Sequence, residues 1–183
     1  MAPNEAKTRE ELIDPALERA GWNLRDPNQV RFEIPVDGFD PQAWQILQAE
    51  LKKIKEQHHI YEGALPKGIC DYALYRPNGE IIAVVEAKRT SIDPRLAEPQ
   101  TRFYLTEIAK RQSFCPFGFM TNGRDIYFYD MGYASKRQVQ GFFSPDDLKN
   151  LLYLRQNALP LTQIPINNRS EERRVGKECR SRW

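Results

Sequence analysis

The sequence predicts an α/β fold in which a mixed central β-sheet is flanked by helices. Two observations lead to this prediction. Segments with helical spacing of apolar residues alternate with short strand-forming runs, and an Asn-Gly turn joins two of those runs into a hairpin. The expected order is helix, strand, helix, hairpin, helix, two strands and a last helix. With 183 residues, 40% of them hydrophobic, the chain is long enough for one domain with a buried core.

The segment before the hairpin is expected to form two helices separated by a strand. Thr8-Arg9-Glu10-Glu11 has the form of a capping box, which begins a helix that ends at Gly21. Residues 30–36 alternate as a strand, and residues 41–57 have apolar side chains at helical spacing. The expected apolar helix faces are Leu12, Ile13, Ala16, Leu17 and Ala20 in the first helix and Trp44, Leu47, Leu51 and Ile54 in the second.

The hairpin over residues 71–88 is the most informative segment. Asn78-Gly79 predicts a two-residue loop, because both residues tolerate a positive φ. This loop sets the facing pairs, which are Pro77 with Glu80, Tyr75 with Ile82, and Asp71 with Glu86. A four-residue loop keeps the same register, whereas a three-residue loop breaks it. Lys88 lies two residues after Glu86, so it shares the face of the two carboxylates.

Asp71, Glu86 and Lys88 are therefore the candidate catalytic residues. Two facing carboxylates destabilise a sheet unless a cation lies between them, and their hard oxygen ligands suit Mg²⁺. A lysine beside such an ion can orient or deprotonate a water and offset charge on a phosphate. The alternative is a solvated ion cluster, but the apolar run over residues 81–85 favours a buried metal site. Glu11 is either an additional acidic site residue or only the carboxylate of the capping box.

The segment after the hairpin completes the predicted fold. A connection over residues 91–99 leads to a helix from Pro99 to about Gln112. Two strands follow at residues 117–120 and 125–130, separated by a Thr-Asn-Gly turn. The last helix is expected to be capped by Ser144-Pro145-Asp146-Asp147, with Leu148, Leu151, Leu152 and Leu154 as its apolar residues.

Composition restricts the class of protein and its location. No apolar run reaches the roughly 18 residues of a membrane span, and the N-terminus lacks a signal-peptide pattern. The three cysteines have no metal-binding spacing, and an odd number argues against a disulfide framework. We therefore expect a cytoplasmic protein with no membrane partner.

The last fifteen residues, 169–183, differ from the rest of the chain. Nine of the fifteen are charged, and RSEERRVGKECRSRW resembles the translation of a sequencing-adapter oligonucleotide. We expect an adapter-derived, disordered segment, and the alternative is a native basic tail. The segment holds six Lys or Arg and three Glu, so without it the formal net charge changes from +2 to −1. Basicity is therefore no argument for nucleic-acid binding.

Asp71 followed by Glu86-Ala87-Lys88 resembles the signature of the PD-(D/E)xK nuclease superfamily. More narrowly, residues 8 to about 160 are similar to the N-terminal nuclease domain of the R subunit (HsdR) of type I restriction enzymes. Four features carry this resemblance: TREELIDPALERAGW, VVEAKRT, the pair Gln100 and Tyr104, and PFGFMTNGRDIYFYD. The acidic triplet alone arises by chance in many chains, whereas the ordered combination is specific.

The resemblance implies Mg²⁺-dependent cleavage of double-stranded DNA by a restriction-endonuclease-like core. Asp71 and Glu86 would be the metal ligands, and Lys88 would position or activate water. Gln100 and Tyr104 would help to orient DNA, and their alternative role is helix packing. A local positive patch is expected from Arg89, Arg95, Arg102, Lys110 and Arg111, with Arg89 and Arg102 as DNA contacts.

The resemblance also implies a domain organisation. Residues 1–160 would be the endonuclease domain, and residues 161–168 would begin a linker to a helicase-like motor that is absent here. The sequence has no P-loop motif, so only the motor of the parent would use ATP. The implied partners are double-stranded DNA and the modification and specificity subunits of a type I complex, in a bacterial or archaeal cytoplasm. The alternatives are a stand-alone nuclease of defence or repair and a non-catalytic DNA-binding or assembly domain.

Overall fold

The structure is a computed structural model that describes residues 5–36, 41–58 and 68–158. The chain divides into two compact units, Met1–Leu151 and Leu152–Trp183, and the sheet belongs to the first unit. The expected linker at residues 161–168 and the adapter-like segment at residues 169–183 lie outside the described residues.

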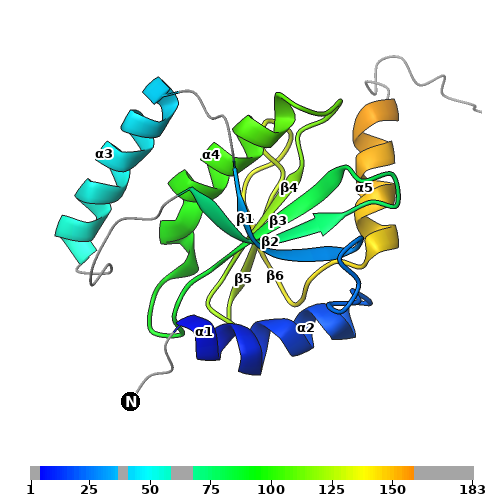
Figure 1. The fold of residues 1–183 in the computed structure, drawn as a ribbon, viewed down its shortest axis with the longest axis horizontal. Helices are drawn as coiled ribbons and strands as arrows, with labels where there is room; N and C mark the ends of the chain where they lie inside the picture. Colours follow the sequence, from blue (N-terminus) through cyan, green and yellow to red (C-terminus); the bar gives the residue numbers. More distant parts are fainter. Residues whose placement is uncertain (1–4, 37–40, 59–67, 159–183) are drawn as a thin grey trace, which may run out of the picture. The chain divides into compact units, whose positions relative to one another are not determined.

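A six-stranded sheet forms the centre of the first unit, with the strand order β1-β2-β3-β4-β5-β6 (Figure 1). The strands are β1 (Val30–Pro35), β2 (Ile69–Tyr75), β3 (Ile81–Ala87), β4 (Phe117–Thr121), β5 (Ile126–Tyr129) and β6 (Arg137–Val139). Strands β3 and β4 are parallel, and the other neighbouring pairs are antiparallel. This mixed sheet confirms the predicted α/β class.

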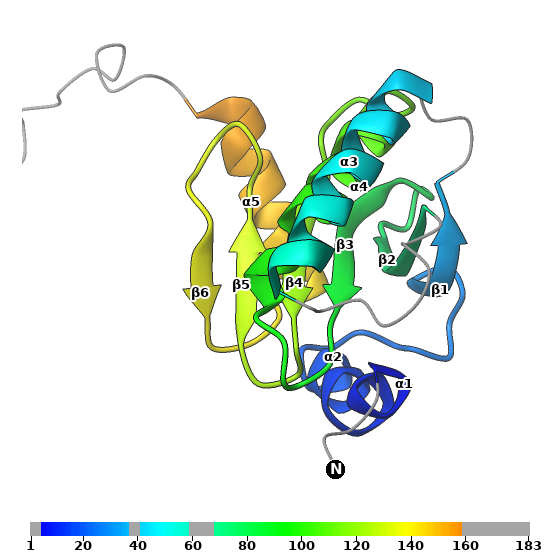
Figure 2. The ribbon, with the colours of Figure 1, turned by 90° about the vertical axis from the view of Figure 1, so that its left-hand side faces the viewer.

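Helices flank the sheet. They are α1 (Glu5–Thr8), the π-helical turn η1 (Arg9–Ile13), α2 (Asp14–Arg19), α3 (Pro41–His58), the 3₁₀ turn η2 (Pro94–Ala97), α4 (Glu98–Ala109) and α5 (Pro145–Asn157). Helix α4 provides the crossover that the parallel strands β3 and β4 require, and it packs against both. Helix α3 packs on α4, and the two helices lie on the same side of the sheet (Figure 2).

Two apolar clusters cover the two faces of the sheet. The first joins the sheet to α3 and α4 and contains Val36, Leu47, Leu51, Cys70, Ala73, Val84, Phe103, Tyr104, Leu105 and Ile108. The second is aromatic and contains Phe117, Phe119, Phe128, Phe142 and Phe143, with ring centroids between 4.8 and 5.8 Å apart. Val84 belongs to the first cluster, whereas its neighbour Val85 pairs with Phe119 of the second. The alternation of side chains along β3 therefore separates the two clusters.

The turn of the hairpin differs from the prediction. The Arg76 backbone N–H donates to the Glu80 carbonyl and the Gly79 N–H donates to the Arg76 carbonyl, both at 2.9 Å, so the loop has three residues, 77–79. The predicted facing of Pro77 with Glu80 is therefore wrong. Pro77 suits the first position of a type I turn, and Gly79 has the positive φ of 82° that follows such a turn. Tyr75 consequently faces Ile81 and not Ile82.

A register shift between Leu74 and Tyr75 compensates for the shorter loop. Beyond this shift the facing pairs are those predicted, namely Leu74 with Ala83, Ala73 with Val84, and Tyr72 with Val85. The prediction that a three-residue loop breaks the register is therefore wrong, because it left out a bulge.

The first helix begins earlier than predicted. Helix α1 starts at Glu5, and Thr8 has helical backbone angles and makes no side-chain capping hydrogen bond. Thr8 is buried, and a Cβ atom built on Gly123 would lie 3.1 Å from its methyl group. The predicted capping box is therefore wrong, because Thr8 is enclosed inside the first turns. The predicted end of the helix at Gly21 is confirmed by its φ of 93°.

The predicted cap of α5 is confirmed, because Ser144 Oγ accepts a hydrogen bond from the Asp147 backbone N–H at 3.1 Å. The Asp147 carboxylate accepts one from the Ser144 backbone N–H at 3.2 Å.

Strand β6 was not predicted, because its three residues are polar or partly exposed and show no apolar alternation.

The close approach of α4 to β4 requires a glycine at position 118. A Cβ atom at Gly118 would lie 2.7 Å from Thr101 Cγ2 and 3.2 Å from Leu105 Cδ1. Thr101 is buried, and its hydroxyl donates to the Ala97 carbonyl at 3.0 Å, so it cannot easily move.

We expect Gly118→Ala to lower the free energy of unfolding by ~1–3 kcal/mol in chemical denaturation. Gly141→Ala is the control, because a Cβ there meets nothing within 4 Å, and equal losses would contradict this reasoning.

Candidate active site

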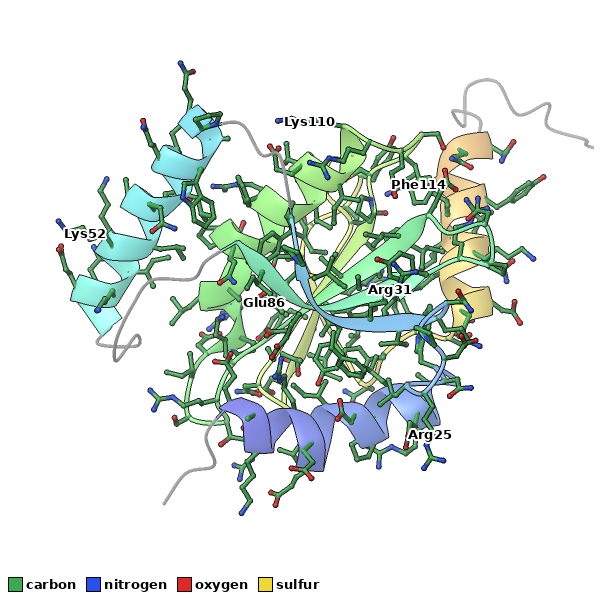
Figure 3. All side chains as sticks on the ribbon, viewed as in Figure 1. Arg25, Arg31, Lys52, Glu86, Lys110 and Phe114 are labelled. Carbon is green, nitrogen blue, oxygen red and sulfur yellow. The ribbon has the colours of Figure 1, made fainter. Side chains whose placement is uncertain are left out.

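The adjacent ends of β2 and β3 bring Asp71, Glu86 and Lys88 together. The pairing of Tyr72 with Val85 continues to Asp71 and Glu86, which places both carboxylates on the face covered by α4. Lys88 Nζ donates to Glu86 Oε1 at 2.7 Å. Figure 3 shows Glu86 in the interior, between the sheet and α4. Glu86 and Lys88 are only 2% and 4% exposed, so they are not a solvated ion cluster.

Asp71 is held by two hydrogen bonds. Its Oδ2 accepts from the backbone N–H of Ala87 at 2.7 Å, and its Oδ1 accepts from Arg9 Nη1 at 3.2 Å. Burial raises the pKa of Asp71 above its usual value, and Lys88, the Ala87 N–H and Arg9 oppose this rise. The bond to Ala87 ties the Asp71 carboxylate to the end of the strand that carries Glu86.

The two oxygens of Glu86 differ in their surroundings. Oε1 accepts from Lys88, whereas Oε2 is a buried oxygen with no hydrogen-bond partner among the residues that the structure describes. Burial raises the pKa of Glu86 to about 8, although Lys88 lowers it. A buried oxygen without a partner costs free energy unless something binds it. A hard divalent cation would satisfy this oxygen, so the donor atoms fit Mg²⁺ or Mn²⁺.

The site offers few acidic ligands. Within residues 5–36, 41–58 and 68–158, no three His, Cys, Asp or Glu side chains converge in a way that could hold a metal. Mg²⁺ commonly takes one or two protein carboxylates and keeps water or phosphate oxygens as its other ligands. Asp71 and Glu86 are enough for that mode of binding.

Gln100 and Tyr104 connect the site to α4. Lys88 Nζ donates to Gln100 Oε1 at 3.4 Å. Gln100 Nε2 donates to the Tyr104 hydroxyl at 2.9 Å, and this hydroxyl donates to the Ile69 carbonyl at 2.8 Å. Both side chains are buried, and their spacing of four residues places them on one face of the helix. The structure therefore links this pair to the ammonium of Lys88 and to the start of β2.

Glu5, and not Glu11, is the additional acidic residue whose charge interacts with these groups. Glu11 is exposed, and its carboxylate pairs with a lysine one turn earlier at 3.4 Å. Burial raises the pKa of Glu5, and the charges of Lys88, Asp71 and Arg9 also act on it. Sequence reasoning missed Glu5 and Arg9 because both lie around the wrongly placed helix start. Their spacing of four residues on a helix was the available signal.

Ion pairs neutralise much of the expected positive patch. The pairs are Arg95 with Asp93 at 2.6 Å, Arg102 with Glu50 at 2.8 Å, and Lys110 with Glu107 at 2.6 Å. Figure 3 shows Lys110 at the far end of α4 from Glu86, and Arg111 is the next residue along the chain. Arg89 directly follows Lys88 and is partly buried. Of the expected cations, Arg89 is the one that the sequence places beside the site.

Residues 53–137 match the sequence model of a family described as type I restriction enzyme R protein N terminus (HSDR_N). The matched residues include the hairpin with Asp71, Glu86 and Lys88, and also Gln100 and Tyr104. This part of the chain is similar to the HsdR N-terminal family. The resemblance that the sequence motifs predicted is therefore confirmed over these residues.

The HsdR likeness extends to the fold. The chain is similar to the fragment structure of a protein assigned as an HsdR subunit of a type I restriction enzyme from Vibrio vulnificus YJ016. The TM-score is 0.55 at 22% sequence identity, and the match covers 83% of this chain and 26% of that one. The chain thus spans about a quarter of that structure. No curated protein shows a significant sequence match, and no helix in the described ranges has the length and apolar character of a membrane span.

The stability of the metal-free protein should depend on the protonation of Glu86. Its pKa is about 8 in the folded protein against an ordinary value of 4.5, so between these values the folded state binds more protons than the unfolded state. Raising the pH across this window therefore destabilises the folded protein. We compare the free energy of unfolding of Glu86→Gln with that of the wild type. As the pH rises from about 5 to 8, we expect this difference to shift by at least ~1 kcal/mol in favour of Glu86→Gln. Urea denaturation in EDTA measures this, and parallel pH curves would contradict it.

Proposed function

We propose that this chain is the Mg²⁺-dependent endonuclease domain of a type I restriction enzyme R subunit, acting on double-stranded DNA. The observation that supports this best is the meeting of Asp71, Glu86 and Lys88 at the adjacent ends of β2 and β3, where Glu86 Oε2 has no hydrogen-bond partner among the described residues. The HsdR family match over residues 53–137 supports the same function. The intact set of three residues argues against a non-catalytic assembly domain.

Asp71 and Glu86 would hold the metal, with Glu5 as a nearby acidic group. A bound Mg²⁺ would stabilise negative charge on the scissile phosphate and lower the pKa of a water ligand. The chain prepares for this ion by keeping two carboxylates in a buried place, where they gain more from a cation than they would in water. Arg9, the Ala87 N–H and Lys88 compensate part of their charge before the ion binds.

Lys88 would act on the attacking water and on the phosphate. Its ammonium is nearly buried, so water screens its charge weakly and it can stabilise a phosphorane-like transition state. Two acceptors, Glu86 Oε1 and Gln100 Oε1, orient Nζ within the site. In this mechanism Gln100 and Tyr104 are positioning residues, because they act through Lys88 and the strand end at Ile69.

DNA binding by these residues alone should be weak and dependent on salt. Arg89 is the strongest candidate for a phosphate contact, because it directly follows Lys88 in the chain. Arg102 is paired with Glu50. We assign base recognition to the specificity subunit of a type I complex, and ATP use to a motor outside these residues. The cytoplasm of a bacterium or archaeon is the corresponding location.

Replacing either carboxylate should weaken metal binding and abolish cleavage. Asp71→Asn and Glu86→Gln keep the side-chain size and remove a charged ligand, so we expect Mn²⁺ affinity to fall at least about tenfold. Calorimetric titration of the 183-residue chain measures this fall in affinity.

Lys88→Met should not weaken Mn²⁺ binding. It should lower plasmid cleavage by an assembled type I complex with Mg²⁺ and ATP about a hundredfold or more.

Glu11→Gln is the matched control, because Glu11 is exposed on the same N-terminal segment as Glu5 and lies outside the site. Its Mn²⁺ affinity and cleavage rate should equal those of the wild type. Undiminished cleavage by the Asp71→Asn, Glu86→Gln and Lys88→Met variants in the assembled complex would reject the nuclease assignment.

Gln100 distinguishes positioning from direct contact with DNA. Gln100→Leu removes one of the acceptors of Lys88, so we expect cleavage at saturating DNA to fall about ten- to a hundredfold while the Kd for DNA stays nearly unchanged. The measurement is the cleavage rate of the assembled complex over a range of DNA concentrations. A raised Kd with a normal rate at saturation would show that Gln100 contacts DNA instead.

A further inference from the structure

Arg9 reaches the candidate metal site from η1 and bridges two carboxylates. Its Nη1 donates to Asp71 Oδ1 at 3.2 Å, and its Nη2 donates to Glu33 Oε1 at 2.8 Å. The guanidinium also lies 6.0 Å from the centre of the Tyr72 ring. Asp71 belongs to the site and is mostly buried, whereas the Glu33 side chain is 64% exposed. One cation therefore joins a carboxylate inside the site to a carboxylate outside it.

Glu33 has an unusual backbone conformation. Its φ is +51°, and in the part of the chain that the structure describes it is the residue other than glycine with a positive φ. It lies opposite Asp71, because Phe32 pairs with Tyr72 and Ile34 pairs with Cys70. The left-handed region is unfavourable for a residue with a Cβ atom, and such residues are concentrated at functional sites. The unfavourable conformation occurs at the residue that holds Arg9.

We propose that Arg9 is a positioning residue that competes with the metal for Asp71, and that Glu33 retains Arg9 when the metal binds. The inference rests on the proposed function, since it requires a metal at Asp71 and Glu86. In the metal-free protein, Arg9 compensates the charge of Asp71. When a dication takes Asp71, the Nη1 contact is lost and the Nη2 contact to Glu33 remains.

The geometry of the guanidinium allows this exchange. The two contacts use different nitrogens of one planar group, so one can break while the other persists. The contact to Asp71 is the longer of the two, 3.2 Å against 2.8 Å, so the weaker bond is the one that the metal must replace. A cation and a dication on one carboxylate repel each other, so each lowers the affinity for the other.

Arg9 would thereby set the metal concentration at which the site fills. Without Arg9, the Asp71 carboxylate would lose one of its two hydrogen-bond donors and would bind a dication more readily. With Arg9 but without Glu33, the guanidinium would have Asp71 as its remaining carboxylate partner and would be harder to displace. Glu33 should therefore affect metal binding only through Arg9.

The test is a calorimetric titration of Mn²⁺ into the 183-residue chain and its variants. Arg9→Gln removes the competing cation, so we expect Mn²⁺ to bind about five- to tenfold more tightly. Glu33→Gln leaves Arg9 on Asp71, so we expect Mn²⁺ to bind at least about threefold more weakly. In the Arg9→Gln background, Glu33→Gln should change the affinity by less than about 1.5-fold.

The double variant separates exchange from a simple effect of charge. If Glu33 acted only as a nearby negative charge, its replacement would weaken Mn²⁺ binding equally with and without Arg9, and the proposal would be wrong. Arg31→Gln is the matched control, because Arg31 lies on the same strand as Glu33 but donates to the Pro27 carbonyl and stacks on Tyr75. Its replacement should leave the Mn²⁺ affinity unchanged within about 1.5-fold.

Glu86→Gln distinguishes failure of this inference from failure of the proposed function. If Mn²⁺ binding requires Glu86 but is unchanged in Arg9→Gln, only the role of Arg9 is overturned. Mn²⁺ binding that does not require Glu86 would overturn both. Glu33 is exposed, so Glu33→Gln should fold even if Arg9→Gln does not. Arg9→Lys then replaces Arg9→Gln, because lysine keeps the charge without the two-pronged bridge, and the effect of Glu33→Gln should shrink in that background.

Discussion

The buried ion pair between Glu86 and Lys88 is the constraint on which the rest of the first unit depends. Glu86 lies on β3 in the middle of the sheet, where its carboxyl group has almost no access to water. Removing one partner of such a buried pair typically costs ~3–5 kcal/mol, because the other charge is left uncompensated. Neighbouring elements therefore supply polar groups that compensate these buried charges. The packing around Glu86 consequently also sets the chemistry of the site.

Helix α4 owes its position partly to that same ion pair. Gln100 accepts from Lys88, and Tyr104 carries the hydrogen-bond chain on to the Ile69 carbonyl in β2. On the sheet side, Gly118 lets the helix approach β4 closely. A movement of α4 would therefore disturb the Lys88 ammonium, so the fold itself holds the geometry of the site.

Several cations of this unit form ion pairs within the protein. Arg95, Arg102 and Lys110 each pair with a nearby carboxylate, and Arg9 bridges Asp71 and Glu33. Exposed pairs of this kind contribute little to stability, but they leave less free positive charge for phosphates. The paired cations support the weak DNA binding that we propose for these residues.

The sequence by itself determined the α/β class, the order of most elements and the facing of Asp71 with Glu86. Local patterns carry this information, since strand alternation, the Asn-Gly turn and helix caps each depend on residues close in the chain. The family was also readable from ordered motifs, and the match over residues 53–137 confirms it.

Only the tertiary structure decided which distant groups meet. The burial of Thr8 depends on elements far apart in the sequence, because its methyl group lies beside Gly123. The compensating bulge at Leu74 and the contact of Gln100 with Lys88 depend on how neighbouring elements pair and pack. The same holds for the Arg9 bridge from η1 to β1 and β2. A sequence pattern records spacing along one element, whereas the partners of a buried charge are set by how several elements pack around it.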